Sequence, residues 1–368
     1  MTLIRIAVSV LRAVNLVFKP MKLKNKVAII SRQSDVPTLD VEMLADALDR
    51  ENTKTVILTK KLDKSPSGLL SYSIHLLKQM YHIGTSKVVV IDGYCIPVSI
   101  LPHKKGQTII QMWHALGAIK KFGWQNTDNP DGHSIEVSEA MCMHRNYDYI
   151  LAPSEITGKF FSQAFRTPEE KIYYCGLPRI DFLRKTDEKM YDQISTVYGE
   201  IREKPVVLYV PTFRKDSAIS MENLIESFDF SSFNLVIKKH FLDKGDYSGA
   251  REKGAIVDEQ FSSMEWLRIA DKVVTDYSAI AFEAAAIDKE LYIYQPDIHL
   301  YENNVGLNIN LQDEPIGHYV CSTGEELSAL LSEPYDREKA EEFRKKYISV
   351  NTENCTGQLT GFITGFLK

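Results

Sequence analysis

Three short segments carry side chains that could do chemistry, and each begins where an apolar run ends and the chain turns. They are MWHALGAIKKFG at residues 112–123, VPTFRK at 210–215 and TDYSAIAFEAA at 275–285. The strand ends of an α/β sheet bind ligands, because helix N-termini and backbone amides converge there. Together the segments supply a histidine, an arginine, further cations and a hydroxyl-rich helix start. This set suits the binding of a pyrophosphate and the activation of a hydroxyl group.

The strongest candidates for chemistry are a histidine and an arginine. His114 lies in the turn after a predicted strand at 108–113. Its imidazole can exchange a proton near pH 7, so it is a candidate general base acting on a hydroxyl. The alternative is a loop histidine that only hydrogen-bonds the neighbouring backbone. Arg214, close to Thr212, suits a phosphate through its planar guanidinium, and a salt bridge between domains is the alternative.

Further candidates end the strands that follow. Lys238 and His240 close the run NLVIKKH, where they can meet a phosphate. Ser278 is predicted to cap a helix over residues 279–287, whose amides and dipole favour an anion; capping without a ligand is the alternative. Glu283 lies one turn into that helix. There it accepts hydrogen bonds from ribose or polyol hydroxyls, or simply faces solvent.

The chain lacks the motifs of several enzyme classes. It has no GxxxxGK[ST], no GxGxxG after the first strand, no HExxH, and no G-x-S-x-G around Ser154 or Ser278. NTPases, dinucleotide enzymes, zincins and serine hydrolases therefore lose their main support. The 5 cysteines are scattered without a CxxC, which argues against disulfides and zinc and favours a reducing compartment. No Asp/Glu cage is evident, so we expect neither a metal nor another cofactor.

The composition is that of a globular protein with more than one domain. The 368 residues exceed one typical core and suit two. Hydrophobic residues make up 44% and charged residues 25%, which argues against wholesale disorder. The net charge of −5 gives no reason to expect a nucleic-acid partner.

The N-terminus breaks this overall acidity, because no acid precedes Asp35. Wound as a helix, residues 1–24 gather their cations in one sector, and apolar side chains cover the rest. The apolar run falls short of the ~20 residues of a bilayer span, and its interruption by a cation argues against a signal peptide. We expect a helix at the surface of an anionic membrane; the alternative is a core-packing helix with a solvated basic edge. The cations expected to meet the membrane are Arg5, Arg12, Lys19 and Lys22.

From residue 26 onward, short β-branched runs alternate with longer helical patterns. Strands are predicted at 27–31, 55–59, 87–92, 108–113, 149–153 and 171–176, and then at 206–211, 234–240, 255–258, 272–276 and 291–296. Helices are predicted at 39–48, 69–81, 135–145 and 155–165, and through most of 325–367. Apolar strands separated by helices indicate parallel sheets covered on both faces. We predict an α/β fold of two doubly wound domains with a cleft, the chain crossing between them near GLPRIDFL at 176–183.

In this order, the segments resemble a known family. WHALGAIKKFG, GLPR, PTFR, a basic K-x-H after a strand, and TDYS with an acid five residues on are similar to the CDP-glycerol glycerophosphotransferases of teichoic acid synthesis. The matches run from residue 111 to 297, and WHALGAIKKFG resembles the short priming enzymes more than the long polymerases. The chain departs from the family pattern at Leu177, Phe241 and Ala279, where the family has asparagine, proline and a second serine.

The resemblance implies a GT-B fold, with two Rossmann-like domains facing across a cleft behind an N-terminal amphipathic helix. The expected parts are a membrane-surface helix over 1–24, an acceptor domain over 25–180 and a CDP-donor domain over 181–368, whose last helix can pack back on the acceptor domain.

The resemblance also implies roles for the site residues. The expected catalytic residues are His114, Arg214 and His240, with His114 as the base. The expected donor-binding residues are Pro178, Arg179, Thr212, Lys238, Thr275, Asp276, Ser278 and Glu283.

The implied reaction transfers glycerol phosphate from CDP-glycerol to a sugar hydroxyl of an undecaprenyl-diphosphate-linked disaccharide and releases CMP. The enzyme would act peripherally at the cytoplasmic face of the membrane, because the acceptor is a lipid and the donor is cytosolic. Three alternatives stay open: a CDP-ribitol-dependent or capsule-directed polyol-phosphate transferase, a GT-B nucleotide-sugar glycosyltransferase, and a catalytically silent membrane adaptor.

Overall fold

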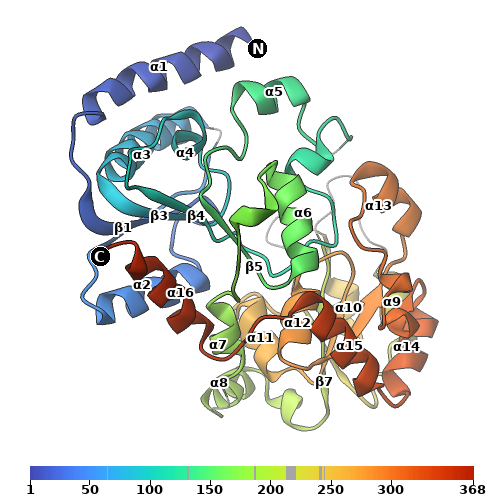
Figure 1. The fold of residues 1–368 in the computed structure, drawn as a ribbon. Helices are drawn as coiled ribbons and strands as arrows, with labels where there is room; N and C mark the ends of the chain where they lie inside the picture. The colour runs from blue at the N-terminus through green and yellow to red at the C-terminus, as the bar shows by residue number, and fades with distance from the viewer. Residues whose placement is uncertain (64, 131, 186–187, 213–220, 240–242, 244) are drawn as a thin grey trace. The chain divides into compact units, whose positions relative to one another are not determined.

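A computed structural model describes every residue of the chain except 64, 131, 186–187, 213–220, 240–242 and 244. The chain divides into two compact units. Unit 1 comprises residues 1–115, 121–181 and 350–368, and unit 2 comprises residues 116–120 and 182–349. Each unit is built on one parallel sheet with helices along its strands (Figure 1).

Unit 1 contains a six-stranded parallel sheet in the order β2-β1-β3-β4-β5-β6. Its strands are β1 (Lys24–Ser31), β2 (Thr55–Thr59), β3 (Ser86–Ile91), β4 (Thr108–Gln111), β5 (Tyr149–Ala152) and β6 (Ile172–Tyr174). Its helices are α1 (Thr2–Phe18), α2 (Leu39–Arg50), α3 (Pro66–Thr85), α4 (Ile96–Ile100), α5 (Ile135–Ala140), α6 (Glu155–Phe165) and α16 (Cys355–Gly365). The strand order changes direction between β1 and β3, which is where ligands bind in doubly wound sheets.

Unit 2 contains a second six-stranded parallel sheet, in the order β12-β11-β10-β7-β8-β9. Its strands are β7 (Val206–Val210), β8 (Asn234–Ile237), β9 (Ile256–Val257), β10 (Lys272–Thr275), β11 (Glu290–Tyr294) and β12 (Val320–Cys321). Its helices are α8 (Lys189–Val197), α9 (Glu222–Ser227), α10 (Ser248–Glu252), α11 (Ser263–Ile269), α12 (Ile280–Ala286), α13 (Ile298–Asn304), α14 (Gly324–Ser332) and α15 (Arg337–Tyr347), and α7 (Arg179–Leu183) runs from unit 1 into it. Here the order changes direction between β7 and β10.

The predicted α/β fold with two doubly wound parallel sheets is confirmed. The central strands form because β-branched runs bury both faces; Val88, Val89 and Val90 of β3, for example, are fully buried. The ends of several elements differ from the prediction: β8 ends at Ile237 rather than at residue 240, and α5 ends at Ala140 rather than at residue 145. Strand β4 ends at Gln111 rather than 113, so two residues separate it from His114, and the short strand β12 was not predicted.

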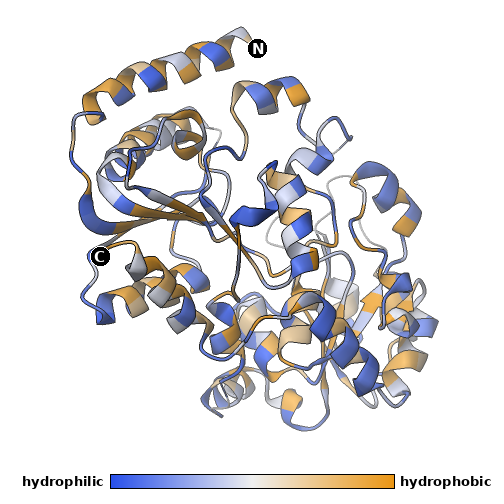
Figure 2. Ribbon diagram, in the orientation of Figure 1, coloured by the Kyte–Doolittle hydropathy of each residue, from blue (hydrophilic) through white to orange (hydrophobic). Residues whose placement is uncertain are grey.

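Helix α1 has three faces, whereas the sequence predicted only a cationic face and an apolar face. One apolar face packs on α3, α4 and α5, where Val8 is buried with Met80, Ile100, Leu101 and Cys142. A second apolar face is exposed, with Leu3 at 81% and Val10 at 55% exposed (Figure 2). A third carries the cations Arg5, Arg12 and Lys19. The core-packing alternative thus describes one face of the helix, and contact of the exposed apolar face with a membrane stays a prediction.

Helix α3 also exposes an apolar stripe. Its outer side carries four exposed hydrophobic residues, while its inner side is buried. The exposed members are Leu69, Leu70, Ile74 and Leu77. Among the described helices, none is both long and apolar enough to cross a membrane.

Candidate functional site

His114 lies at the carboxyl edge of the unit 1 sheet, two residues beyond Met112, whose amide still bonds the Ile91 carbonyl. Its Nδ1 lies 2.7 Å from the backbone carbonyl oxygen of Asp92. Because a carbonyl only accepts, Nδ1 carries the proton in the neutral ring and Nε2 is the basic nitrogen. The Gln33 amide lies 3.0 Å from the same Nδ1, and a flip of that amide would present a second acceptor. The contact with the Asp92 carbonyl favours the tautomer in which Nε2 is free to accept a proton.

Trp113 sets the turn that carries His114. It adopts φ 63°, the left-handed conformation that bulky residues rarely take. Its amide donates to the Gln111 side chain at 3.0 Å, and its ring stacks on Phe122 at a centroid distance of 4.9 Å. Such a conformation persists only where surrounding contacts enforce it, and it is common at functional sites. The strained turn supports a special role for the next residue, His114.

Asp92 directly follows β3 and is buried, at 2% exposed. Neither of its carboxyl oxygens has a partner at full hydrogen-bond geometry among the residues that the structure describes. Burial raises the pKa of this carboxyl to about 6, although the Ser31 hydroxyl lies close enough to lower the pKa in part. Perturbed groups of this kind concentrate at functional sites, so Asp92 joins His114 as a feature of this edge.

The donor-binding candidates of unit 2 come together at the switch point between β7 and β10. The Asp276 carboxylate accepts hydrogen bonds from the Thr212 amide at 3.0 Å and from its hydroxyl at 2.7 Å. It also accepts from the Tyr277 amide at 2.6 Å. Thr275 donates its hydroxyl to the Val210 carbonyl at 2.8 Å. The ends of both strands are thereby tied into one rigid turn, with α12 beginning just beyond it.

Two expectations for α12 need correction or refinement. The expectation that Ser278 caps this helix is wrong: the cap position is Ala279, without a side-chain cap, and Ser278 Oγ only accepts a long 3.4 Å hydrogen bond from the Ile280 amide. Glu283 does not face solvent, because every residue of α12 is buried. The carboxyl group therefore belongs to the interior of unit 2.

Lys238 is held by protein groups in this structure. Its ammonium has three hydrogens, and acceptors for all three lie within reach: the Asp258 carboxylate and carbonyl at 2.9 Å each, and the Phe261 carbonyl at 2.5 Å. The Asp258 carboxylate also accepts from Tyr198 and Trp266. Lys238 thus fixes the turn after β9, and its contact with the donor stays a prediction.

Pro178 and Arg179 lie in unit 1, and the second is tied to α2. The Asp40 carboxylate accepts from the Arg179 amide at 2.8 Å, from Nε at 2.8 Å and from Nη2 at 2.5 Å. Asp181 caps α16 by accepting from the amides of Cys355 and Thr356 at 2.8 Å each. The GLPRID segment thus joins α2 and the last helix to the sheet of unit 1.

Arg214 and His240 lie outside the described residues, so their assignments stay predictions. The segment after His114 is described and belongs to unit 2. There Gly117 packs so closely on Phe282 that an added Cβ would lie 2.3 Å from the ring. Only glycine allows this approach to α12.

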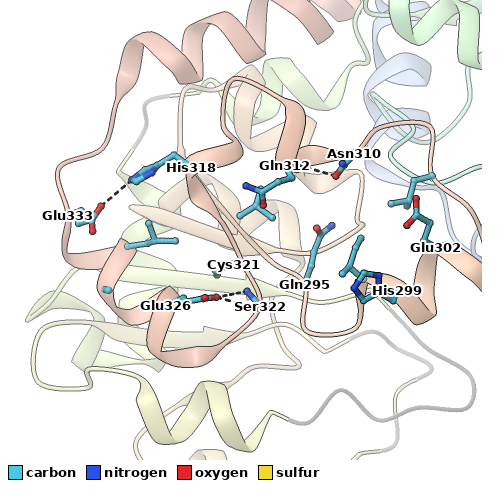
Figure 3. A pocket seen from close by; sticks show the side chains of 15 residues that line it. Gln295, His299, Glu302, Asn310, Gln312, His318, Cys321, Ser322, Glu326 and Glu333 are labelled. Carbon is cyan, nitrogen blue, oxygen red and sulfur yellow. Dashed lines mark hydrogen bonds and ion pairs between the residues drawn. The ribbon is translucent and has the colours of Figure 1, made fainter.

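A pocket of about 660 Å³ lies beside β11, β12, α13 and α14 of unit 2 (Figure 3). Several of its polar side chains pair within the pocket wall, as Glu333 does with His318 and Glu326 with Ser322. Gln295, at the end of β11, reaches the Asp276 carbonyl at 3.5 Å. Within the described part of the chain, no group of three or more His, Cys, Asp or Glu side chains could hold a metal ion.

The sequence analysis did not single out Arg32, Gln33 or Asp92. They directly follow β1 and β3, the two strands at the switch point. The available signal was a polar residue directly after the first predicted strand and another at the end of the third. This pattern of polar residues was not recognised because it matches no known motif.

The sequence of this chain matches the family model of CDP-glycerol:poly(glycerophosphate) glycerophosphotransferases over residues 13–364. A teichoic acid ribitol-phosphate primase of Bacillus spizizenii is 26% identical over 360 residues, covering 93% of this chain and 92% of that protein. A teichoic acid glycerol-phosphate primase of Bacillus subtilis is 27% identical over 303 residues, covering 80% of this chain and 78% of that protein.

Solved structures agree with the fold. A structure of the wall teichoic acid polymerase TagF matches with a TM-score of 0.77 at 20% identity, covering 100% of this chain and 97% of that one. A UDP-GlcNAc 2-epimerase from Neisseria meningitidis matches with a TM-score of 0.58 at 10% identity, covering 94% and 100%. These likenesses confirm the GT-B type of fold.

Proposed function

The chain belongs to the CDP-glycerol:poly(glycerophosphate) glycerophosphotransferase family, and on this premise we propose that it transfers glycerol phosphate from CDP-glycerol to a sugar hydroxyl of an undecaprenyl-diphosphate-linked disaccharide. The reaction releases CMP and contributes to wall teichoic acid synthesis. Support comes from the family match over nearly the whole chain and from relatives named as glycerol-phosphate primases.

The observation that carries the proposal is the geometry of His114. With Nδ1–H donated to the Asp92 carbonyl at 2.7 Å, the basic Nε2 takes the proton of the acceptor hydroxyl. The resulting oxygen attacks the β-phosphorus of the donor and forms the new P–O bond. The bond from the β-phosphorus to the bridging oxygen breaks, and CMP leaves with that oxygen. The backbone carbonyl stabilises the imidazolium that forms, as hydrogen-bond acceptors do for histidine bases.

The turn at Thr212, Asp276 and Ser278 is the proposed donor site. Its backbone is already fixed by the Asp276 carboxylate, so its amides need little reorganisation when a pyrophosphate binds. Arg214 and His240 would add positive charge there, as the resemblance implies. Positioning and electrostatics supply most of the catalysis in phosphoryl transfer, which suits such a site.

We place the enzyme at the membrane surface, because its lipid-linked acceptor resides there. The exposed apolar faces of α1 and α3 would lie in the acyl boundary, with Arg5, Lys19 and Lys22 near anionic headgroups. Arg12 is partly engaged by unit 1, since its Nε reaches the Ile100 carbonyl at 3.3 Å. It therefore contributes less to the membrane than the other three.

One alternative donor has specific support. The ribitol-phosphate primase relative spans 93% of this chain at nearly the same identity as the glycerol-phosphate primase, so CDP-ribitol is the second candidate. CMP release should be measured with CDP-glycerol and with CDP-ribitol, each with and without a soluble analogue of the lipid-linked disaccharide. Acceptor-dependent CMP from CDP-glycerol alone is the expected result. CMP from CDP-ribitol alone selects the second candidate, and no CMP from either overturns both.

A further inference from the structure

Arg32 makes no ion pair with a carboxylate in the part of the chain that the structure describes. Arg32 directly follows β1, and its Nη1 donates to the Tyr94 carbonyl at 2.9 Å. The guanidinium carbon lies 5.8 Å from the centroid of the Tyr94 ring. Its Nε is buried and has no hydrogen-bond partner among the described residues. A buried charged donor left without a partner is costly, so such a group is rarely retained without a ligand.

Four ionisable neighbours of Arg32 are neutral at physiological pH. Those whose titration its charge influences are Tyr72, Tyr94, Cys95 and His144. Burial raises the pKa of both tyrosines, raises that of Cys95 to about 12 and lowers that of His144 to about 3. Within the described ranges, no carboxylate forms an ion pair with Arg32. Arg32 thus has no direct ion pair among the described residues, although the Asp92 carboxyl influences Cys95 together with it.

The position of Arg32 connects it to the base. The next residue, Gln33, has its side-chain amide 3.0 Å from Nδ1 of His114, and Asp92 supplies the carbonyl on the same nitrogen. Arg32 and Asp92 follow β1 and β3, between which the strand order changes direction. The crevice at such a switch point is the usual ligand site of a doubly wound sheet. The cation thus lies at the same edge of the sheet as His114.

We propose that Arg32 anchors a phosphate-binding site on unit 1, separate from the donor residues of unit 2. The inference rests on the proposed function and deepens it, because it assigns a phosphate group to the side of the reaction that carries the base. That group is either the diphosphate of the lipid-linked acceptor or the phosphoryl group in transfer. A guanidinium binds either of them through two parallel N–H···O bonds.

Steady-state kinetics with two acceptors distinguish the two sources. One acceptor is the disaccharide diphosphate bearing a short alkyl chain, and the other is an uncharged alkyl glycoside of the same disaccharide. The variants are Arg32→Ala and Arg32→Lys, with Arg145→Ala as the control, an exposed arginine of unit 1. We expect Arg32→Ala to lower kcat/KM about 10- to 100-fold and Arg145→Ala to leave it unchanged, since a charged hydrogen-bonded contact is lost.

Each pattern of loss has one meaning. An increase in KM for the diphosphate acceptor, with kcat unchanged, assigns Arg32 to the acceptor. A loss in kcat with both acceptors assigns it to the phosphoryl group in transfer. Partial recovery of Arg32→Ala by added guanidinium ion supports either assignment, because a merely structural defect would not respond. Kinetics that match Arg145→Ala with both acceptors overturn the proposal.

Binding of inorganic pyrophosphate, measured by calorimetry, tests the site without turnover. The calorimetric isotherm of wild type should show pyrophosphate binding that is absent in Arg32→Ala and weaker in Arg32→Lys. If Arg32→Ala does not fold, Arg32→Lys carries the test, since it keeps the charge and loses the planar fork. If wild type releases no CMP but shows this Arg32-dependent binding, the proposed function fails while the phosphate site stands. An identical isotherm for wild type and both variants overturns the site.

Discussion

The two switch points of the molecule hold an aspartate in the same place with opposite surroundings. Asp276 follows β10 in unit 2 and Asp92 follows β3 in unit 1, and both are buried, at 0% and 2% exposed. Asp276 accepts hydrogen bonds from Thr212 and Tyr277, whereas neither carboxyl oxygen of Asp92 has a partner at full hydrogen-bond geometry among the described residues. Unit 2 thus offers a finished turn, and unit 1 offers polar groups that a substrate would complete. Polar groups left unsatisfied in a native fold are most often found at functional sites.

The largest expected effect falls on the base at the edge of unit 1. His114→Ala should lower kcat about 10²- to 10⁴-fold, the usual contribution of a general base, with little effect on the melting temperature. The measurement is CMP release at saturating donor and acceptor. His133→Ala, at an exposed histidine of the same unit, is the matched control. If His114→Ala keeps more than about a tenth of the wild-type kcat, His114 is not an essential base.

A second prediction concerns the finished turn. Asp276→Asn should destabilise the protein by about 2 to 4 kcal/mol, because the asparagine NH₂ group would replace Oδ2, which accepts from the Thr212 amide, and the remaining hydrogen bonds would lose their charge. Denaturant unfolding monitored by circular dichroism measures the change. A variant as stable as wild type would mean that the turn is not held by its carboxylate.

The same substitution in unit 1 should act in the opposite direction. Burial raises the pKa of Asp92 from its ordinary value of 3.8 to about 6, so folding favours the protonated form. Wild type should therefore lose stability as the pH rises from about 4 to about 6, and Asp92→Asn should not. At pH 8 we expect the variant to be more stable by about 1 to 3 kcal/mol, and at pH 4 we expect no difference. Equal stability at both pH values would show that the carboxyl group is not isolated.

The smallest effect is expected at the surface of unit 1, where helix α1 has one packed face and one exposed face. Its inner face is packed and its outer face is exposed. Lys19→Gln should weaken binding to anionic vesicles about fivefold, since one cation near such a surface contributes ~1 kcal/mol. Lys345→Gln, at an exposed lysine of α15 in unit 2, is the control. Equal co-sedimentation of both variants would place the membrane contact elsewhere.

The sequence predicted the architecture well because the core strands are unbroken β-branched runs, such as KVVVI before Asp92. It also placed His114 and the residues around Asp276 at strand ends. It could not predict the left-handed Trp113, whose conformation depends on rings distant in sequence, nor the cap at Ala279 in place of Ser278. The sequence also did not identify Arg32 and Asp92 as site candidates, for a similar reason. Their significance lies in partners that they lack, and only three-dimensional structure shows that.

The most direct test of the account is the mass of the acceptor after reaction with CDP-glycerol. Wild type should add one glycerol phosphate to the disaccharide acceptor for each CMP released, and His114→Ala should add none in the same time. This result would show that the chain transfers glycerol phosphate and that the transfer depends on His114. CMP release without a gain in acceptor mass, or an equal gain with His114→Ala, would contradict it.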